Sequence, residues 1–158
     1  MRRFTVPLTA LALLASPAFG QSPRDLLFPR DQGCYMRHYD KAHLAKHPDQ
    51  LVKDIAISPQ AGPSSPRELV VRVVVRLRGN PEQLVGYGYC ENTSGTLSCL
   101  LEGDMGWFQM KPAKSGATVS VGRDGVNFEG DTSVTQLGGG KSDDEIFALT
   151  KAPAGSCP

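Results

Sequence analysis

Apolar and polar residues alternate over residues 68–78, and this is the clearest pattern in the chain. One set of alternate positions is entirely apolar: Leu69, Val71, Val73, Val75 and Leu77. The other set carries the charges, interrupted by two valines: Glu68, Val70, Arg72, Val74, Arg76 and Arg78. A period of two sustained over this length predicts a half-buried antiparallel strand.

Shorter strand-like segments fill most of the remaining chain, separated by turn residues. They cover residues 51–58, 83–91, 96–102, 107–111, 117–122, 126–129, 133–137 and 145–151. Asp124-Gly125 is typical of a type I′ hairpin turn, which would place Val121 opposite Phe128. Gln60 to Pro66 is rich in proline, glycine and serine and predicts a loop.

One short helix is predicted over residues 40–47, where Asp40 can act as the N-cap and Pro48 prevents continuation. Residues 21–33 contain prolines and no periodicity, so an extended lead-in is expected there. About eight short strands with frequent turns predict a mainly β protein, a small up-and-down antiparallel barrel. A β-sandwich is the alternative. We expect residues 34–158 to form one domain.

The N-terminus has the three regions of a signal peptide. Met1-Arg2-Arg3 is basic, Thr5 to Ala15 is apolar, and small residues stand at Ala18 and Gly20. We therefore expect residues 1–20 to be cleaved and the protein to be periplasmic or secreted. The apolar run is about half the ~20 residues that a membrane anchor needs.

Removal of residues 1–20 takes away two arginines and no acid, so the net charge falls from +1 to −1. A domain so close to neutral has no strong electrostatic attraction for nucleic acid or for an anionic membrane. The expected partner is therefore a protein or a small molecule, and neither can be identified from the charge.

Four cysteines in an exported chain predict two disulfides. If Ser94-Gly95 is a two-residue hairpin turn, Cys90 faces Cys99 at a non-hydrogen-bonded pair, where a cross-strand bridge fits. The remaining bridge is then Cys34–Cys157. A crossed pairing is the alternative.

His43 and His47 are spaced to share one helix face and could bind zinc or copper, with Asp40 or Asp49 as a further ligand. The simpler interpretation is a structural one, in which they cap the helix end or bond to the backbone. No other cofactor motif is present. The acidic residues Asp143-Asp144-Glu145, with Asp131, could bind calcium weakly, but a solvated loop is expected.

Two carboxylates, Glu102 and Asp104, precede Trp107 and suggest glycoside hydrolysis, although such pairs are common in turns. No nucleophile motif is present, so no catalytic residue is assigned, and an unrecognised hydrolase remains an alternative. A group of aromatic residues could line a ligand pocket or an interface, or could belong to the core. It comprises Tyr35, Tyr39, Tyr87, Tyr89, Trp107 and Phe108.

Cys34 to Val52 reads C-x-x-R-x-Y-x-x-x-H-L-x-x-H-P-x-Q-x-V, followed by Tyr89-Cys90, Leu97-Ser98-Cys99 and a C-terminal Phe147…Ala152-Pro153…Cys157. In these residues the chain resembles a group of small exported proteins of proteobacteria. The resemblance implies a periplasmic setting and brings no activity or site residues. In architecture alone the strand pattern is similar to calycin-like barrels, which include lipocalin-type carriers and periplasmic inhibitors. The leading hypothesis is a non-catalytic binding or inhibitor-like module, with a metal-binding accessory protein as the alternative.

Overall fold

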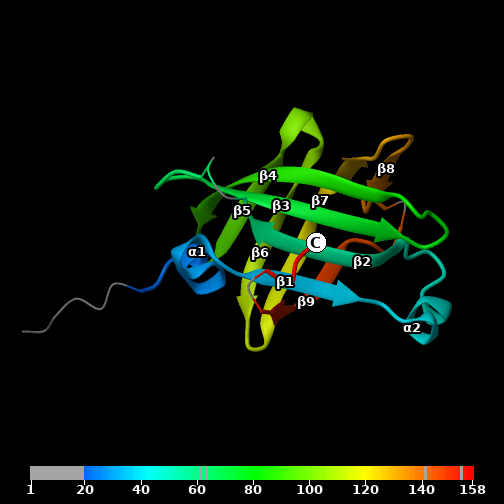
Figure 1. Cartoon of the computed structure of the whole chain (residues 1–158), viewed down its shortest axis with the longest axis horizontal. Helices are drawn as coiled ribbons and strands as arrows, with labels where there is room; N and C mark the ends of the chain where they lie inside the picture. Colours follow the sequence, from blue (N-terminus) through cyan, green and yellow to red (C-terminus); the bar gives the residue numbers. More distant parts are fainter. Residues whose placement is uncertain (1–19, 61, 63, 141, 154) are drawn as a thin grey trace, which may run out of the picture.

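A computed structural model of the chain describes residues 20–60, 62, 64–140, 142–153 and 155–158. Nine antiparallel strands form one sheet, of which eight close into a barrel (Figure 1). The strands are β1 (Cys34–His38), β2 (Val52–Pro59), β3 (Leu69–Leu77), β4 (Gln83–Thr93), β5 (Thr96–Leu101), β6 (Gly106–Ala113), β7 (Gly116–Glu129), β8 (Val134–Leu137) and β9 (Ile146–Ala152). The predicted signal peptide lies, except for Gly20, outside the described residues.

The strands follow one another as a meander from β1 to β7, each hydrogen-bonded to its predecessor. β9 then enters between β7 and β1 and closes the ring. β8 pairs with the C-terminal half of β7 and stays outside the ring. The predicted up-and-down barrel is confirmed, and the alternative of a β-sandwich is wrong.

The predicted hairpin at Asp124-Gly125 is wrong, because β7 runs through it as a single strand. The pairing of β6 with β7 shifts register between Val121 and Val126, so the intervening residues form a bulge. Gly125 adopts a left-handed φ of 80° in this bulge, a conformation that glycine adopts in bulges as readily as in turns. Phe128 consequently pairs with β8 and does not face Val121.

Both predicted disulfides are confirmed, Cys34–Cys157 and Cys90–Cys99. The hairpin register predicted from the Ser94-Gly95 turn is also correct, since Cys90 pairs directly with Cys99. Two disulfides fit an oxidising environment.

β3 is more deeply buried than its alternation predicts. Val70 and Val74 point outward but are almost inaccessible to solvent. The Val70 N–H donates to the Ser64 hydroxyl of the preceding loop at 3.0 Å. The C-terminal residues cover Val74, since Ser156 and Pro158 line the same small hollow and the Cys34–Cys157 bridge holds them there.

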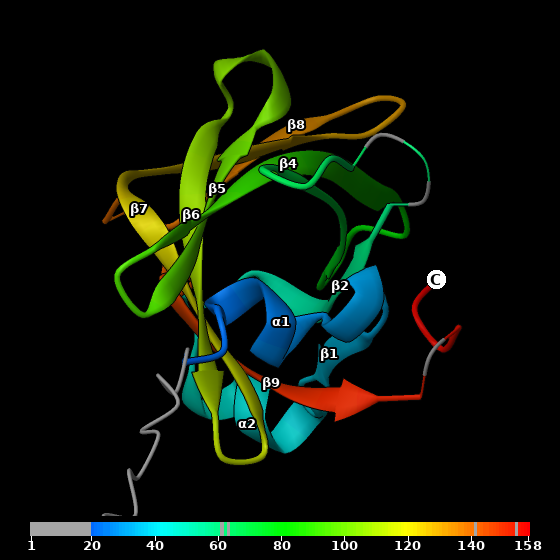
Figure 2. The ribbon, with the colours of Figure 1, turned by 90° about the vertical axis from the view of Figure 1, so that its left-hand side faces the viewer.

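Residues 21–33 are not extended as expected, because their apolar residues are used to close one end of the barrel. The helix α1 (Pro23–Leu27) begins with Ser22 as its N-cap. Leu27 and the following Phe28 are fully buried. Figure 2 shows α1 lying across this opening, and α2 (Lys41–Lys46) lies at the opposite end (Figure 1).

Candidate functional site

The interior of the barrel is filled by its own side chains. The space left at its centre is a void of about 20 Å³, and the described residues that line it are all apolar. A void of this size has room for about one water molecule, whereas a ligand pocket measures several hundred cubic ångströms. The barrel in this conformation therefore has no room for a carried ligand, and the sites of interest lie on its outer surface.

Three large apolar side chains lie next to one another on the outside of β4, β5 and β6. Tyr89 pairs with Leu100, and Leu100 pairs with Trp107. Their side chains are 37%, 55% and 40% exposed. We call these three residues the apolar row, and adjacent cross-strand pairs of this kind contact one another on one face of a sheet.

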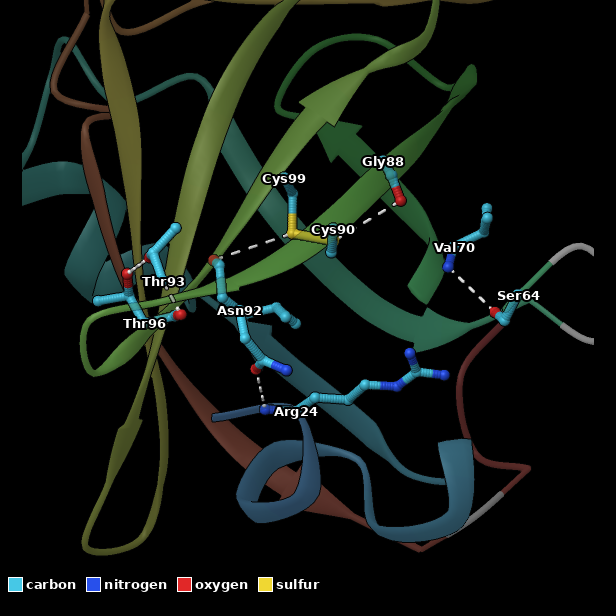
Figure 3. Close-up of a disulfide and its surroundings, with 10 residues drawn as sticks. Arg24, Ser64, Val70, Gly88, Cys90, Asn92, Thr93, Thr96 and Cys99 are labelled. Atoms are coloured by element: carbon cyan, nitrogen blue, oxygen red, sulfur yellow. Dashed lines mark hydrogen bonds between the residues drawn. A yellow bond between two sulfur atoms is a disulfide. The ribbon is translucent and has the colours of Figure 1, made fainter. Parts of the chain in front are cut away.

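Strand alternation explains why these three residues face outward. The residue next to each in sequence faces the core: Cys90 beside Tyr89, Cys99 beside Leu100, and Phe108 beside Trp107. The Cys90–Cys99 disulfide therefore lies inside the barrel, beneath the apolar row. It links β4 and β5, two of the three strands that carry the row (Figure 3).

The β4–β5 hairpin is also stabilised by a hydrogen bond across its turn and by a hydrogen bond from α1. The hydroxyls of Thr93 and Thr96 are hydrogen-bonded at 2.6 Å, and the Arg24 N–H of α1 donates to the Asn92 side chain at 2.9 Å (Figure 3). The bridge, the turn and the α1 contact restrain this hairpin at three places.

A hollow of about 450 Å³ lies over the apolar row. Its lining adds two carboxylates and two hydroxyls to the three apolar side chains: Glu68, Glu91, Thr93 and Ser98. Trp107 is seated on Gly122 of β7, since a Cβ at that glycine would lie 2.7 Å from the indole Cε2 and Nε1. The hollow thus has an apolar floor with an acidic rim.

A second hollow, of about 270 Å³, lies further along β4 where it approaches the end of β7. Tyr87 lines it together with Glu102 and Glu129. Of the carboxylate pair predicted from the sequence, Glu102 lines this hollow and Asp104 does not. The two carboxylates that do line it, Glu102 and Glu129, lie in an open depression of the surface.

The aromatic residues selected from the sequence fall into two groups. Tyr87, Tyr89 and Trp107 lie on the outer surface. Tyr35 and Tyr39 are core residues, and burial raises the pKa of both phenols above the usual value. The Tyr35 hydroxyl donates to the Leu27 carbonyl at 2.8 Å and so fastens the end of α1. These two tyrosines therefore have structural roles.

The predicted histidine pair lies at the α2 end of the barrel. The His43 and His47 rings are stacked, with their centroids 4.4 Å apart. The Tyr39 ring also packs against the His43 ring, with a centroid separation of 4.7 Å. The His43 Nε2 is hydrogen-bonded to the Gln50 amide oxygen at 2.9 Å. His47 is the C-cap of α2 with non-helical dihedral angles, so it lies at the very end of the helix, and its ring still stacks on that of His43.

Asp40 caps α2 by accepting a hydrogen bond from the His43 N–H at 2.7 Å. Asp49 lines a different hollow, together with Gly140, Ser142, Asp143, Glu145 and Ile146. In the part of the chain that the structure describes, no three His, Cys, Asp or Glu residues are grouped to hold a metal ion.

The acidic segment near β9 differs from the expected solvated loop in one residue. Asp144 is completely buried, and its carboxylate accepts hydrogen bonds from the Leu51 and Val52 N–H groups at 2.8 and 3.0 Å. It fixes the start of β2 to the segment before β9. Asp131 belongs to another loop, where its backbone contacts Glu82.

Leu100 and the rim residues Glu68 and Glu91 are members of the outer site that sequence reasoning missed. The signal was present in the predicted hairpin register. Once Cys90 and Cys99 bond inside the barrel, Tyr89 and Leu100 have to face outward as neighbours.

No protein-family model, curated protein or solved structure matches the chain. Among the described residues, no helix combines the length and the hydrophobicity that crossing a membrane requires.

Proposed function

We propose that the protein is an exported, non-catalytic binding module that recognises a protein partner through the apolar row of Tyr89, Leu100 and Trp107. The observation that carries the proposal is the exposure of these three adjacent side chains on a barrel whose interior is filled. Tyrosine and tryptophan are the residue types most enriched at energetically important positions of protein interfaces.

The filled interior favours a protein partner over a small ligand. A carrier of the lipocalin type binds its ligand inside the barrel, where this chain leaves about 20 Å³. The outer hollow is open to solvent on the face of the sheet, which suits contact with a protein surface. The resemblance to small exported proteobacterial proteins and the two disulfides support a periplasmic or secreted location.

The restraints on this hairpin support the same proposal. A surface held by a disulfide and by paired strands loses little conformational entropy on binding, so more of the contact energy is available for affinity. An inhibitor-like module depends on this property, since its partner meets a preformed surface.

Site-specific photocrosslinking in cells that export the protein tests the proposal. A photoreactive phenylalanine analogue replaces Leu100, and in a matched control it replaces Ile146, which is 67% exposed on β9. We expect a discrete protein adduct from position 100 and none from position 146. The adduct should disappear when Trp107→Ala is added in the same chain.

Two outcomes would contradict the proposal. The first is the absence of an adduct at position 100 in correctly exported protein. The second is an equal pattern of adducts at positions 100 and 146, which would indicate random collisions.

A further inference from the structure

The charged side chains that line the two hollows on the outer surface of β4 are all acidic. Glu68 and Glu91 line the hollow over the apolar row, and Glu102 and Glu129 line the second hollow. Among the residues that the structure describes, no lysine or arginine lines either hollow. This distribution contrasts with the chain as a whole, which has 17 basic and 16 acidic residues.

One basic residue that neighbours this surface, Arg72, is directed away from the two hollows by a hydrogen bond. Arg72 pairs with Tyr87 across β3 and β4. Its guanidinium donates to the terminal carbonyl oxygen of Pro158, which lies on the other side of β3 over β2. The guanidinium is therefore held by the C-terminal tail and does not line the hollows.

The outer face of β4 connects the two hollows. Val85 and Tyr87 line the second hollow, and Tyr89, Glu91 and Thr93 line the first. From residue 85 to residue 93 an extended strand spans about 27 Å at about 3.4 Å per residue. An extended segment of about eight residues, laid along β4, would therefore reach both hollows.

We propose that this surface binds an extended, cationic segment of a protein partner, laid along β4 with lysine or arginine side chains in the two hollows. The inference rests on the proposed function and specifies the chemistry of the partner. A cation in the first hollow lies over the Tyr89 ring and beside Glu91, so cation–π attraction and charge-assisted hydrogen bonds act together. An apolar residue of the segment contacts Leu100, which lies between Tyr89 and Trp107.

A pair of synthetic peptides tests the charge requirement on the full mature chain. The cationic peptide has eight residues in which lysine, serine, leucine and serine repeat, so that lysine and leucine share one side of an extended strand. The acidic peptide has glutamate in place of lysine. Trp107, the only tryptophan of the chain, reports binding through its fluorescence.

We expect the cationic peptide to change the Trp107 emission in a saturable way and the acidic peptide to have no effect. The double variant E91Q/E102Q should weaken cationic binding by about three- to tenfold. The matched control D49N/D143N removes two charges at the α2 end and should leave binding unchanged. Raising the salt concentration should weaken binding to the wild-type chain.

The outcomes separate this inference from the proposed function. Equal binding of both peptides, or unaltered affinity of E91Q/E102Q, would overturn the charge requirement. If position 100 still crosslinks to a partner in cells, the proposed function survives such a result. Failure of both cationic binding and crosslinking would overturn both proposals.

Discussion

The indole ring of Trp107 on β6 lies directly against the backbone of Gly122 on β7, with no room for a side chain at that glycine. A Cβ there would lie 2.7 Å from the indole and 2.9 Å from the Trp107 carbonyl oxygen. The position of the Trp107 indole therefore requires glycine at residue 122, because the ring packs where a side chain of the neighbouring strand would otherwise lie.

Gly122→Ala should displace the Trp107 indole and destabilise the β6–β7 pairing by about 1–3 kcal/mol, because the added methyl overpacks this contact. The emission spectrum of Trp107 and its quenching by iodide measure the displacement, and urea unfolding measures the stability. Thr118→Ala on the same strand is the control and should alter neither emission nor quenching. An unchanged spectrum in Gly122→Ala would show that the indole is not seated on this glycine.

Asp144 is the buried link between β2 and the segment before β9, and its removal should be costly. Asp144→Ala leaves the Leu51 and Val52 N–H groups without their acceptor, and an unsatisfied buried donor costs about 1–3 kcal/mol. Urea unfolding should show that the free energy of unfolding falls by the cost of one or two unsatisfied donors, each about 1–3 kcal/mol. Asp143→Asn, at the exposed neighbouring residue, should stay within about 0.5 kcal/mol of wild type. Equal losses in the two variants would contradict this role.

The two disulfides close loops of very different length and should contribute unequally. The loop-closure model gives about 5 kcal/mol for Cys34–Cys157, which are 123 residues apart, and about 2.5 kcal/mol for Cys90–Cys99, which are 9 apart. The double alanine variants, compared by urea unfolding, should follow this order. The reverse order would show that core packing of Cys90 and Cys99 outweighs loop closure.

The sequence was sufficient to predict the barrel because its meander depends on local signals. Alternation identified β3, and the Ser94-Gly95 turn determined the register that pairs Cys90 with Cys99. The same register contained the outward pairing of Tyr89 with Leu100. Local hairpins carry this information because turn type and length determine which residues face each other.

Two features could not be predicted because they depend on contacts between distant segments. Asp124-Gly125 has the composition of a hairpin turn, but pairing with both β6 and β8 makes it a bulge within one strand. Leu27 and Phe28 lie in a segment without periodicity, and only the open end of the barrel gives them a place to be buried. Tertiary burial overrides local preference in both cases.

Tyr35 fastens α1 to the barrel, and its phenol makes the fold sensitive to alkaline pH. Burial raises the pKa of this phenol above its usual value of 10.0, so the folded state holds the proton more tightly than the unfolded chain. The contribution of the Tyr35 phenol to the free energy of unfolding is therefore fully present below pH 10. It is lost as the pH rises through the raised pKa that this phenol has in the folded state. Tyr35→Phe removes the hydrogen bond to the Leu27 carbonyl and should cost about 1 kcal/mol at neutral pH.

Amide hydrogen exchange should show faster opening of α1 in Tyr35→Phe. A series of urea unfolding measurements between pH 8 and about 11 should show a smaller alkaline loss for the variant than for wild type. Parallel alkaline curves for the two proteins would contradict the assignment. Tyr89→Phe, which changes an exposed phenol, serves as the control.

Glu82 should make the free energy of unfolding depend on pH in the acidic range, whereas Tyr35 does so in the alkaline range. Its carboxylate accepts hydrogen bonds from the Ser133 hydroxyl and the Thr132 N–H at 2.6 and 2.8 Å, and these bonds, the first above all, hold its pKa below the usual 4.5. The folded state therefore binds this proton less tightly than the unfolded chain does. The resulting stabilisation is complete above pH 4.5 and is lost as the pH falls through the lowered folded pKa.

Ser133→Ala separates this mechanism from a general effect of acid, because it retains Glu82 and removes its main hydrogen-bond donor. Carboxyl-carbon NMR titration should show the pKa of Glu82 moving up toward 4.5 in the variant. Unfolding measured from pH 7 down to about 2 should lose less stability in Ser133→Ala than in wild type, since less differential proton binding remains. An unshifted titration of Glu82 in Ser133→Ala would show that another group lowers its pKa.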